Sequence, residues 1–258
     1  MGNLIRMNLY RMRKSRGFWV CLILTFAFAL ASTPLSKLMS ILGGMLSDDA
    51  SLSIFTNTIN LSDFLYSPIG AFGRMLAFLA ACSFFYADIE NGYIKNIAGQ
   101  MPRLGYTVLS KYMAAIALTL VFTVAALAGQ LLGSLPFQRI VLDGGILDGL
   151  RMFILKFLLM QGVCAILLLF TGSLGIKSLG TVLSVLFGLG LMSLIYLAID
   201  AGIGQVFRNT SFSISDYMPD QLLGAASLST VKALVVAAVT NGLFLWLAVR
   251  VFDRQDVK

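Results

Sequence analysis

Apolar runs of about 20 residues recur along this chain, and they constrain its fold more than any other feature. A helix needs about 20 residues to cross a hydrocarbon core that is about 30 Å thick. Hydrophobic residues make up 58% of the 258 residues and charged residues only 12%, which lies outside the usual composition of a soluble domain. The short alternating strands of a membrane β-barrel are missing from this pattern. The sequence therefore predicts an all-α integral membrane protein.

We predict a single transmembrane domain over residues 1–258 with six membrane-spanning helices. The predicted spans are residues 18–38, 68–86, 112–132, 152–171, 179–198 and 231–251. An even number of spans places both termini on one side of the membrane. That side carries twelve Lys and Arg residues in its termini and loops, against three in the odd-numbered loops. The positive-inside rule then predicts that both termini and the loop between spans two and three are cytoplasmic.

The N-terminal segment, residues 3–16, has the pattern of a basic amphipathic helix. Its apolar side holds Leu4, Ile5, Leu9 and Met12, and its polar side holds Arg6, Arg13 and Lys14. Such a helix lies in the membrane interface with its cations near anionic lipid headgroups. The alternative is an ordinary basic flank that only fixes topology.

Residues 88–111 form a polar island between two apolar runs. Residues 88–100 have a helical pattern that Asp88 can cap and that Pro102 ends. The apolar face of this predicted helix holds Ile89, Tyr93, Ile94 and Ile97, and its polar face includes Lys95 and Asn96. Glu90 falls on the apolar face and therefore needs a cationic partner, for which the nearest candidates are Arg103, Arg13 and Lys14. The alternative is that Glu90 points into water at the rim of a frayed helix.

Small residues recur at every fourth position in several predicted spans and permit close helix approach. They include Gly73, Ala77 and Ala81, then Gly180, Ser184 and Gly188, and the pair Gly129 and Gly133. Sequence alone leaves open whether they pack inside the bundle or across a dimer.

The apolar outer loop at residues 199–230 is expected to pack back onto the bundle, either as a re-entrant hairpin or as a small cap.

Three cations, Arg74, Lys156 and Lys232, fall inside the outer half of the predicted spans. Buried cations are costly, so we expect them to snorkel or to pair with an outer acid, and the alternative is that they line a pathway. No acid lies deep in any predicted span, which argues against a proton- or sodium-coupled secondary transporter.

The layout resembles that of an ABC-2 type ABC transporter permease. The features that carry the resemblance are the basic N-terminal helix, six spans, the long outer loop, and the island that begins Glu90-Asn-Gly92-Tyr-Ile-Lys95-Asn96. It is most similar to the compact bacterial permeases of lantibiotic immunity, bacitracin resistance and related export. The resemblance implies that residues 3–16 form an elbow helix and that residues 88–100 form a coupling helix on the ATPase subunit. The implied ATPase contacts are Ile89, Glu90, Gly92, Tyr93, Ile94, Lys95, Asn96 and Ile97.

The resemblance also implies partners and a location. The chain has no phosphate-binding loop, because the nearest run, which contains Gly172, Gly175 and Lys177, has the wrong spacing. ATP and Mg would therefore sit on a separate ATPase subunit. A second copy or a homologous permease would complete the pathway in a bacterial cell membrane, and no nucleic acid is implied.

The expected function is export of an amphipathic substrate such as an antimicrobial peptide, an antibiotic or a lipid-like compound. The chain contains no histidine and no paired deep carboxylates, so we expect no catalytic, metal or cofactor site and no enzyme activity in it. The alternative is an immunity or sensor protein that binds an antimicrobial compound without transporting it.

Overall fold

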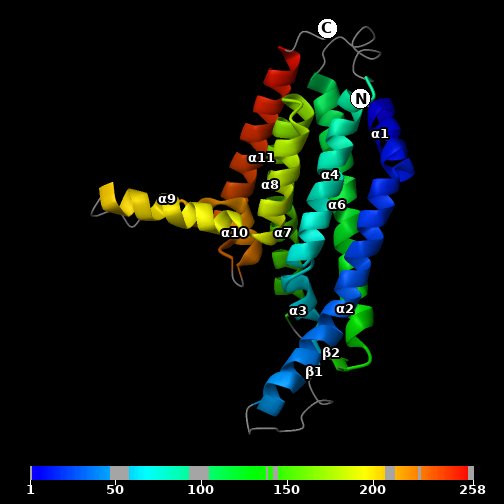
Figure 1. Cartoon of the computed structure of the whole chain (residues 1–258), viewed down its shortest axis with the longest axis vertical. Helices are drawn as coiled ribbons and strands as arrows, with labels where there is room; N and C mark the ends of the chain where they lie inside the picture. The colour runs from blue at the N-terminus through cyan, green and yellow to red at the C-terminus, as the bar shows by residue number, and fades with distance from the viewer. Residues whose placement is uncertain are drawn as a thin grey trace.

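Five helices in the described part of the chain are long and apolar enough to cross a membrane. The structure is a computed structural model that describes residues 2–46, 58–92, 105–137, 139–141, 145–206, 213–225 and 228–254. The five are α2 (Arg16–Leu46), α4 (Ala71–Glu90), α6 (Gly105–Ser134), α7 (Ile146–Leu167) with its π-helical extension η1 (Leu168–Ser173), and α11 (Thr230–Asp253). They stand side by side as one bundle (Figure 1). The chain is therefore a helical, membrane-embedded protein, as its composition predicts.

A sixth apolar segment is broken in the middle. Helix α8 (Lys177–Leu189) and helix α9 (Met192–Val206) meet at an angle of 85°. Gly190 lies between them with a φ of +75°, and the Leu191 amide donates a hydrogen bond to the Leu186 carbonyl, 2.9 Å away. This is a Schellman motif, in which a glycine with positive φ ends the helix and the amide of the following residue bonds to a carbonyl in the last turn. Helix α9 then extends away from the bundle (Figure 1), so the predicted span at 179–198 is not one straight helix.

The bundle is built from close helix pairs. Helix α2 packs along α6, α4 along α8, and α7 along α11. Large side chains such as Phe78, Phe85 and Phe122 are fully buried between them. Side chains on the outer faces of α2 and α11 are apolar and exposed, as expected for helices that face lipid.

The small-residue pattern of α8 is used inside this bundle. A Cβ atom built on Gly188 would lie 2.3 Å from the Cα atom of Met75 in α4, so only glycine fits that contact. The Ser184 hydroxyl, one turn earlier, donates to the Phe78 carbonyl at 3.3 Å. The pair on α6 behaves alike, because a Cβ at Gly133 would lie 2.3 Å from the Leu30 carbonyl oxygen of α2. These stripes therefore pack helix against helix within one chain.

Short elements cover the end of the bundle away from the termini. Strands β1 (Thr58–Asn60) and β2 (Arg139–Val141) pair in parallel, with Ile59 opposite Ile140, and the sequence pattern did not predict them. Helix α3 (Leu61–Tyr66) packs on α7. In the predicted outer loop, the 3-10 turn η2 (Ser215–Tyr217) leads to α10 (Pro219–Gly224), which packs on α7 and α11. Part of that loop thus returns to the bundle, as its apolar residues predict.

The opposite end collects the termini and the start of the polar island. Helix α1 (Gly2–Lys14) corresponds to the predicted interfacial helix and packs against α6 and α2. The last turn of α4, the first turn of α6, the first turn of α8 and the end of α11 reach the same end of the bundle (Figure 1). Residues 93–104, which join α4 to α6, lie outside the described residues.

Candidate functional site

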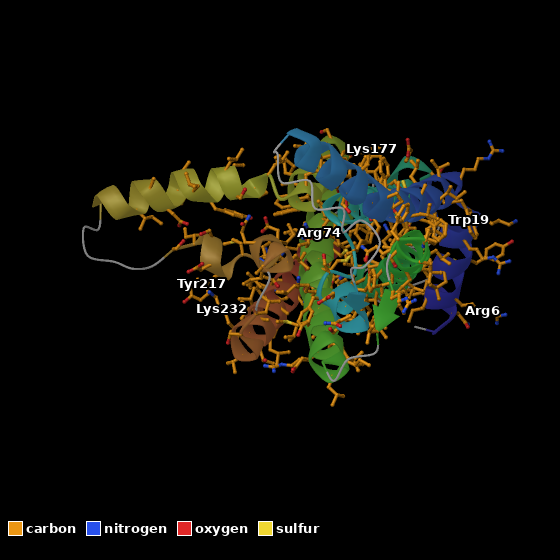
Figure 2. All side chains as sticks on the ribbon, turned by 90° about the horizontal axis from the view of Figure 1, so that it is seen from below. Arg6, Trp19, Arg74, Lys177, Tyr217 and Lys232 are labelled. Atoms are coloured by element: carbon orange, nitrogen blue, oxygen red, sulfur yellow. The ribbon has the colours of Figure 1, made fainter. Side chains whose placement is uncertain are left out.

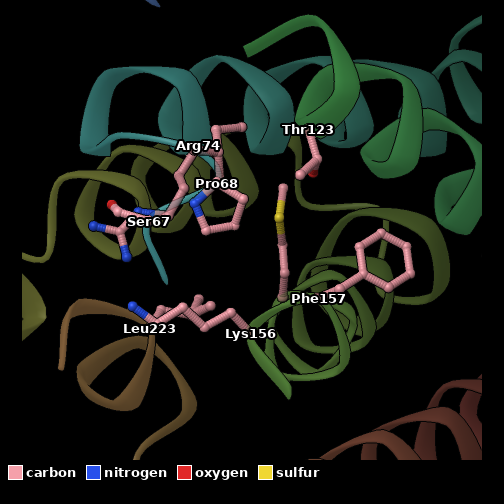
Figure 3. A pocket seen from close by; sticks show the side chains of 9 residues that line it. Ser67, Pro68, Arg74, Thr123, Lys156, Phe157 and Leu223 are labelled. Carbon is pink, nitrogen blue, oxygen red and sulfur yellow. The ribbon is translucent and has the colours of Figure 1, made fainter. Parts of the chain in front are cut away.

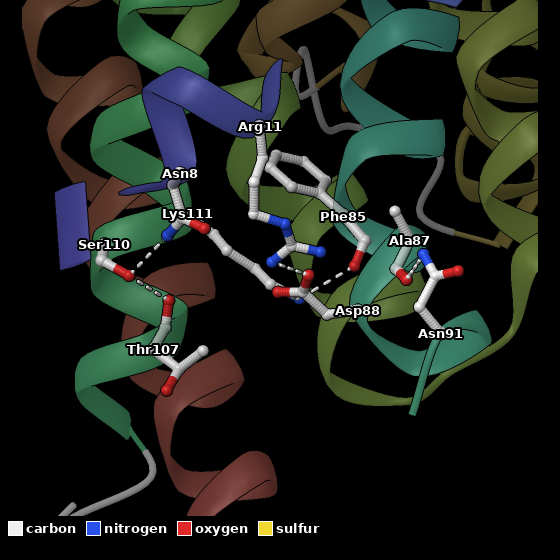
Figure 4. Close-up of polar contacts among 9 residues, drawn as sticks. All are labelled: Asn8, Arg11, Phe85, Ala87, Asp88, Asn91, Thr107, Ser110 and Lys111. Atoms are coloured by element: carbon white, nitrogen blue, oxygen red, sulfur yellow. Dashed lines mark hydrogen bonds and ion pairs between the residues drawn. The ribbon is translucent and has the colours of Figure 1, made fainter. Parts of the chain in front are cut away.

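A buried ionic cluster joins three helices at the end of the bundle that carries the termini (Figure 4). The Asp88 carboxylate, in the last turn of α4, accepts from the Arg11 guanidinium of α1 and from the Lys111 ammonium of α6, the latter at 3.1 Å. The Asp88 and Lys111 side chains are only 4% and 2% exposed. The Lys111 ammonium also donates to the Phe85 carbonyl at 2.9 Å. One carboxylate therefore holds the ends of α1, α4 and α6 together.

A neutral contact reinforces the position of α1. The Asn8 amide donates to the Ser110 hydroxyl at 2.9 Å, and that hydroxyl donates to the Thr107 carbonyl at 2.8 Å (Figure 4). Asn8 and Met12, one turn apart, are buried on the same face of α1. Part of the apolar side of α1, which the sequence predicts to lie in the membrane interface, therefore contacts the start of α6.

An exposed ion pair lies beside the buried cluster. Glu90 accepts from the Lys177 ammonium at 3.2 Å, and the two side chains are 58% and 49% exposed. The same ammonium lies 5.0 Å from the centre of the Tyr86 ring. This pair ties the end of α4 to the start of α8. The predicted candidates Arg13 and Lys14 are therefore not the partner of Glu90. The third predicted candidate, Arg103, lies outside the described residues.

The predicted coupling helix does not begin at Asp88. Helix α4 continues through Glu90, and Asn91 and Gly92 form a turn in which Gly92 has a φ of +63°. Glycine is the residue that adopts this backbone conformation without strain. Asp88 is therefore an inward-facing residue of a spanning helix and not the cap of a separate one. Ile89, Glu90 and Gly92 are placed, whereas the remaining predicted contacts lie outside the described residues: Tyr93, Ile94, Lys95, Asn96 and Ile97.

The cations named for the elbow helix point away from the cluster. Arg6, Arg13 and Lys14 are all exposed, and Figure 2 shows Arg6 at the rim of the molecule. Arg11 is the residue of α1 that turns inward. Sequence reasoning missed it, although helical spacing gives a signal: Arg11 is three positions after Asn8 and next to Met12, which are both buried.

The three cations that the sequence places in the outer half of the spans do not lie at one site. Arg74 of α4 and Lys156 of α7 line one cavity (Figure 3), but Lys232 lies apart, with its ammonium 4.8 Å from the centre of the Tyr217 ring. Figure 2 shows Lys232 beside Tyr217 near the edge and Arg74 within the bundle. Only the first two converge from different helices.

No family model, curated protein or solved structure matches this chain. The likeness to ABC-2 permeases therefore rests on the sequence layout alone.

Replacing Glu90 by Gln is expected to cost less than about 1 kcal/mol of stability, because ion pairs between exposed side chains are weak in water. The measurement is the thermal unfolding midpoint of the purified protein in detergent, followed by tryptophan fluorescence. A large decrease in the unfolding midpoint would mean that the ion pair between Glu90 and Lys177 contributes strongly to stability, contrary to what its exposure predicts.

Proposed function

We propose that this chain is the permease subunit of an ATP-binding cassette exporter of the ABC-2 type. A separate ATPase would dock on the polar island between α4 and α6. The observation that supports this most directly is the buried cluster of Arg11, Asp88 and Lys111, which fixes α1 to the two helices from which the island begins and ends. A partner that pulls on the island would move α4, α6 and α1 as one unit.

The chemistry of the cluster supports a role beyond stability. Burying the Lys111 ammonium and the Asp88 carboxylate is costly, and apolar side chains of similar size often stabilise such a position equally well or better. A buried ionic group does, however, specify one arrangement of the helices. A transport subunit needs such a fixed arrangement of helices at the place where the movement of the ATPase is transmitted to the membrane domain.

The distribution of exposed charge supports a cytoplasmic location for this end. Lys177 begins α8 and Arg254 follows the last residue of α11, and both are exposed at this end of the bundle. Helix α1, which contributes Arg11 to the buried cluster, also exposes Arg6 and Arg13. The positive-inside rule assigns such an end to the cytoplasm. The ATPase then meets the island on the side where ATP is found.

The proposed substrate is an amphipathic compound such as an antimicrobial peptide, an antibiotic or a lipid. A second copy of this chain, or a related permease, completes the pathway in the cell membrane. The competing function is an immunity or sensor protein that binds such a compound without moving it.

Replacing both Ile94 and Ile97 by Asp is expected to abolish binding of the ATPase, because it places two charges on the apolar face of the predicted coupling helix. The tagged chain is purified from its native membrane in a mild detergent. The measurement is vanadate-sensitive ATP hydrolysis by the preparation, together with photolabelling of a co-purifying polypeptide by azido-ATP. The wild type is expected to retain both signals and the double variant to lose them.

The matched control is Asn91→Asp, which adds a charge in the same segment at a residue outside the implied ATPase contacts and should keep the ATPase bound. Wild-type preparations without any bound ATPase would overturn the proposal and leave the binding or sensor function. Equal ATP hydrolysis in the wild type and the isoleucine variant would overturn the assigned docking face.

A further inference from the structure

Two cations from different helices converge on one cavity in the half of the bundle away from the termini. Arg74 comes from the first turn of α4, and Lys156 comes from the third turn of α7. Figure 3 shows their charged ends on the same side of the cavity, whose lining also includes Ser67, Phe157 and Leu223. The enclosed part of this cavity holds about one water molecule, and the rest of the cavity is open. One oxygen of a larger anionic group can therefore enter between the two side chains while the rest of that group stays at the opening.

Within the described residues, neither cation forms an ion pair. Lys156 is only 7% exposed, and in the described part of the chain its ammonium forms no hydrogen bond or ion pair. The Arg74 Nε atom is buried and lacks a hydrogen-bond acceptor in the same residues. An unpaired charge in such surroundings is strongly unfavourable, and a ligand that supplies negative charge would offset that cost.

One acid lies near the cations but is already engaged. Asp220 of α10 attracts Arg74 electrostatically, yet it does not come within the 4.0 Å of an ion pair with either cation. Its two oxygens accept from the Tyr196 hydroxyl at 3.1 Å and from the Gln221 amide at 3.4 Å. Burial raises the pKa of the Asp220 carboxyl, and these hydrogen bonds oppose the rise. Even when Asp220 is ionised, the three groups carry one net positive charge.

We propose that Arg74 and Lys156 bind the phosphate group of a lipid-like amphiphile. A guanidinium can hold two phosphate oxygens at once and an ammonium acts as a point charge beside it, which suits a phosphate group. The site lies between two membrane-spanning helices, where phospholipid is the abundant source of phosphate. Apolar side chains such as Phe157 and Leu223 line the same cavity, so an adjoining acyl chain meets apolar surface.

This site does not depend on the proposed transport function, because binding can be measured without an ATPase. The purified chain in dodecyl maltoside is titrated with dihexanoyl phosphatidic acid, and bound lipid is counted by native mass spectrometry. Dihexanoyl glycerol, which has the same chains without phosphate, tests whether the phosphate is needed. Inorganic phosphate, added as a competitor, tests whether the acyl chains are needed.

We expect the wild type to bind the phosphatidic acid and not the glycerol lipid. Arg74→Gln and Lys156→Gln should each weaken binding by about tenfold or more, since each removes a charge-assisted hydrogen bond. The matched control is Lys232→Gln, which removes a cation that lies over Tyr217 and outside the cavity, and it should leave binding unchanged.

Three outcomes would overturn the inference. Equal binding by the wild type and both cavity variants would show that lipid binds elsewhere. Inorganic phosphate that competes at the same concentration as the lipid would replace the lipid assignment by a free anion. Strong destabilisation of Lys156→Met without ligand would reveal a partner for this ammonium, whereas removal of an unpaired charge should leave the unfolding temperature unchanged or higher.

Discussion

Replacing Asp88 by Asn is expected to destabilise the protein by about 3–5 kcal/mol, the usual cost of removing one member of a buried ion pair. The amide cannot neutralise the Lys111 ammonium, which is 2% exposed and would keep only its hydrogen bond to the Phe85 carbonyl. Arg11 would lose its ion pair at the same time. The contact between α1 and α6 would then rest mainly on neutral contacts such as those of Asn8 and Met12.

The measurement is thermal unfolding in detergent, compared with Glu90→Gln. The two acids are two positions apart in α4, but Asp88 is 4% exposed and Glu90 is 58% exposed. A double-mutant cycle with Lys111→Met separates the pair from other effects. The double variant should be less destabilised than the sum of the two single variants, because no buried charge is left without a partner. Equal, small losses for Asp88→Asn and Glu90→Gln would contradict the role assigned to the buried cluster.

Hydropathy predicted the spanning helices because the requirement for about 20 apolar residues is local. The predicted span at residues 179–198 is wrong because the chain bends at Gly190. The residues on both sides of Gly190 are apolar, so the length of the apolar run does not show that the helix ends there. The sharp bend depends on one glycine with positive φ, and nothing in its neighbours marks it as a break. A glycine in an apolar run is as compatible with close packing as with a helix end.

The candidate site was predicted in part. The predicted helix of the polar island starts at Asp88, whereas in the structure α4 continues through Glu90. Extending the buried positions Ala81 and Phe85 by one turn places Asp88 on the inward face and would have identified its role. Its partners Arg11 and Lys111 come from other helices, and a single sequence does not reveal which helices are neighbours.

The cavity of Arg74 and Lys156 illustrates the same limit. Sequence placed both residues at similar depth in the membrane, but their convergence depends on how α4 and α7 are rotated. Lys232, which the sequence grouped with them, faces Tyr217 instead. Depth along a helix is readable from a sequence, whereas the direction of a side chain around the bundle requires the packing.

Replacing Gly188 by Ala is expected to cost about 3 kcal/mol, the upper part of the usual range for forcing an extra methyl group into a packed core. The new Cβ would lie 2.3 Å from the Met75 Cα atom and 2.6 Å from its backbone nitrogen. Backbone atoms cannot rotate away as a flexible side chain can, so α8 must move away from α4. The nearby bond from the Ser184 hydroxyl to the Phe78 carbonyl would lengthen with it.

The measurement is again the unfolding midpoint in detergent, with Gly242→Ala as the matched control. Gly242 lies within α11 and has no atom within 4 Å of the position that a Cβ would take. Alanine there should be neutral or stabilise by up to about 1 kcal/mol, since it favours the helix and meets nothing. If both alanine variants unfolded like the wild type, α8 would not be packed against α4 at Gly188. Because the exposed Glu90 to Lys177 pair joins the same two helices, Gly188→Ala combined with Glu90→Gln should lose more stability than either change alone.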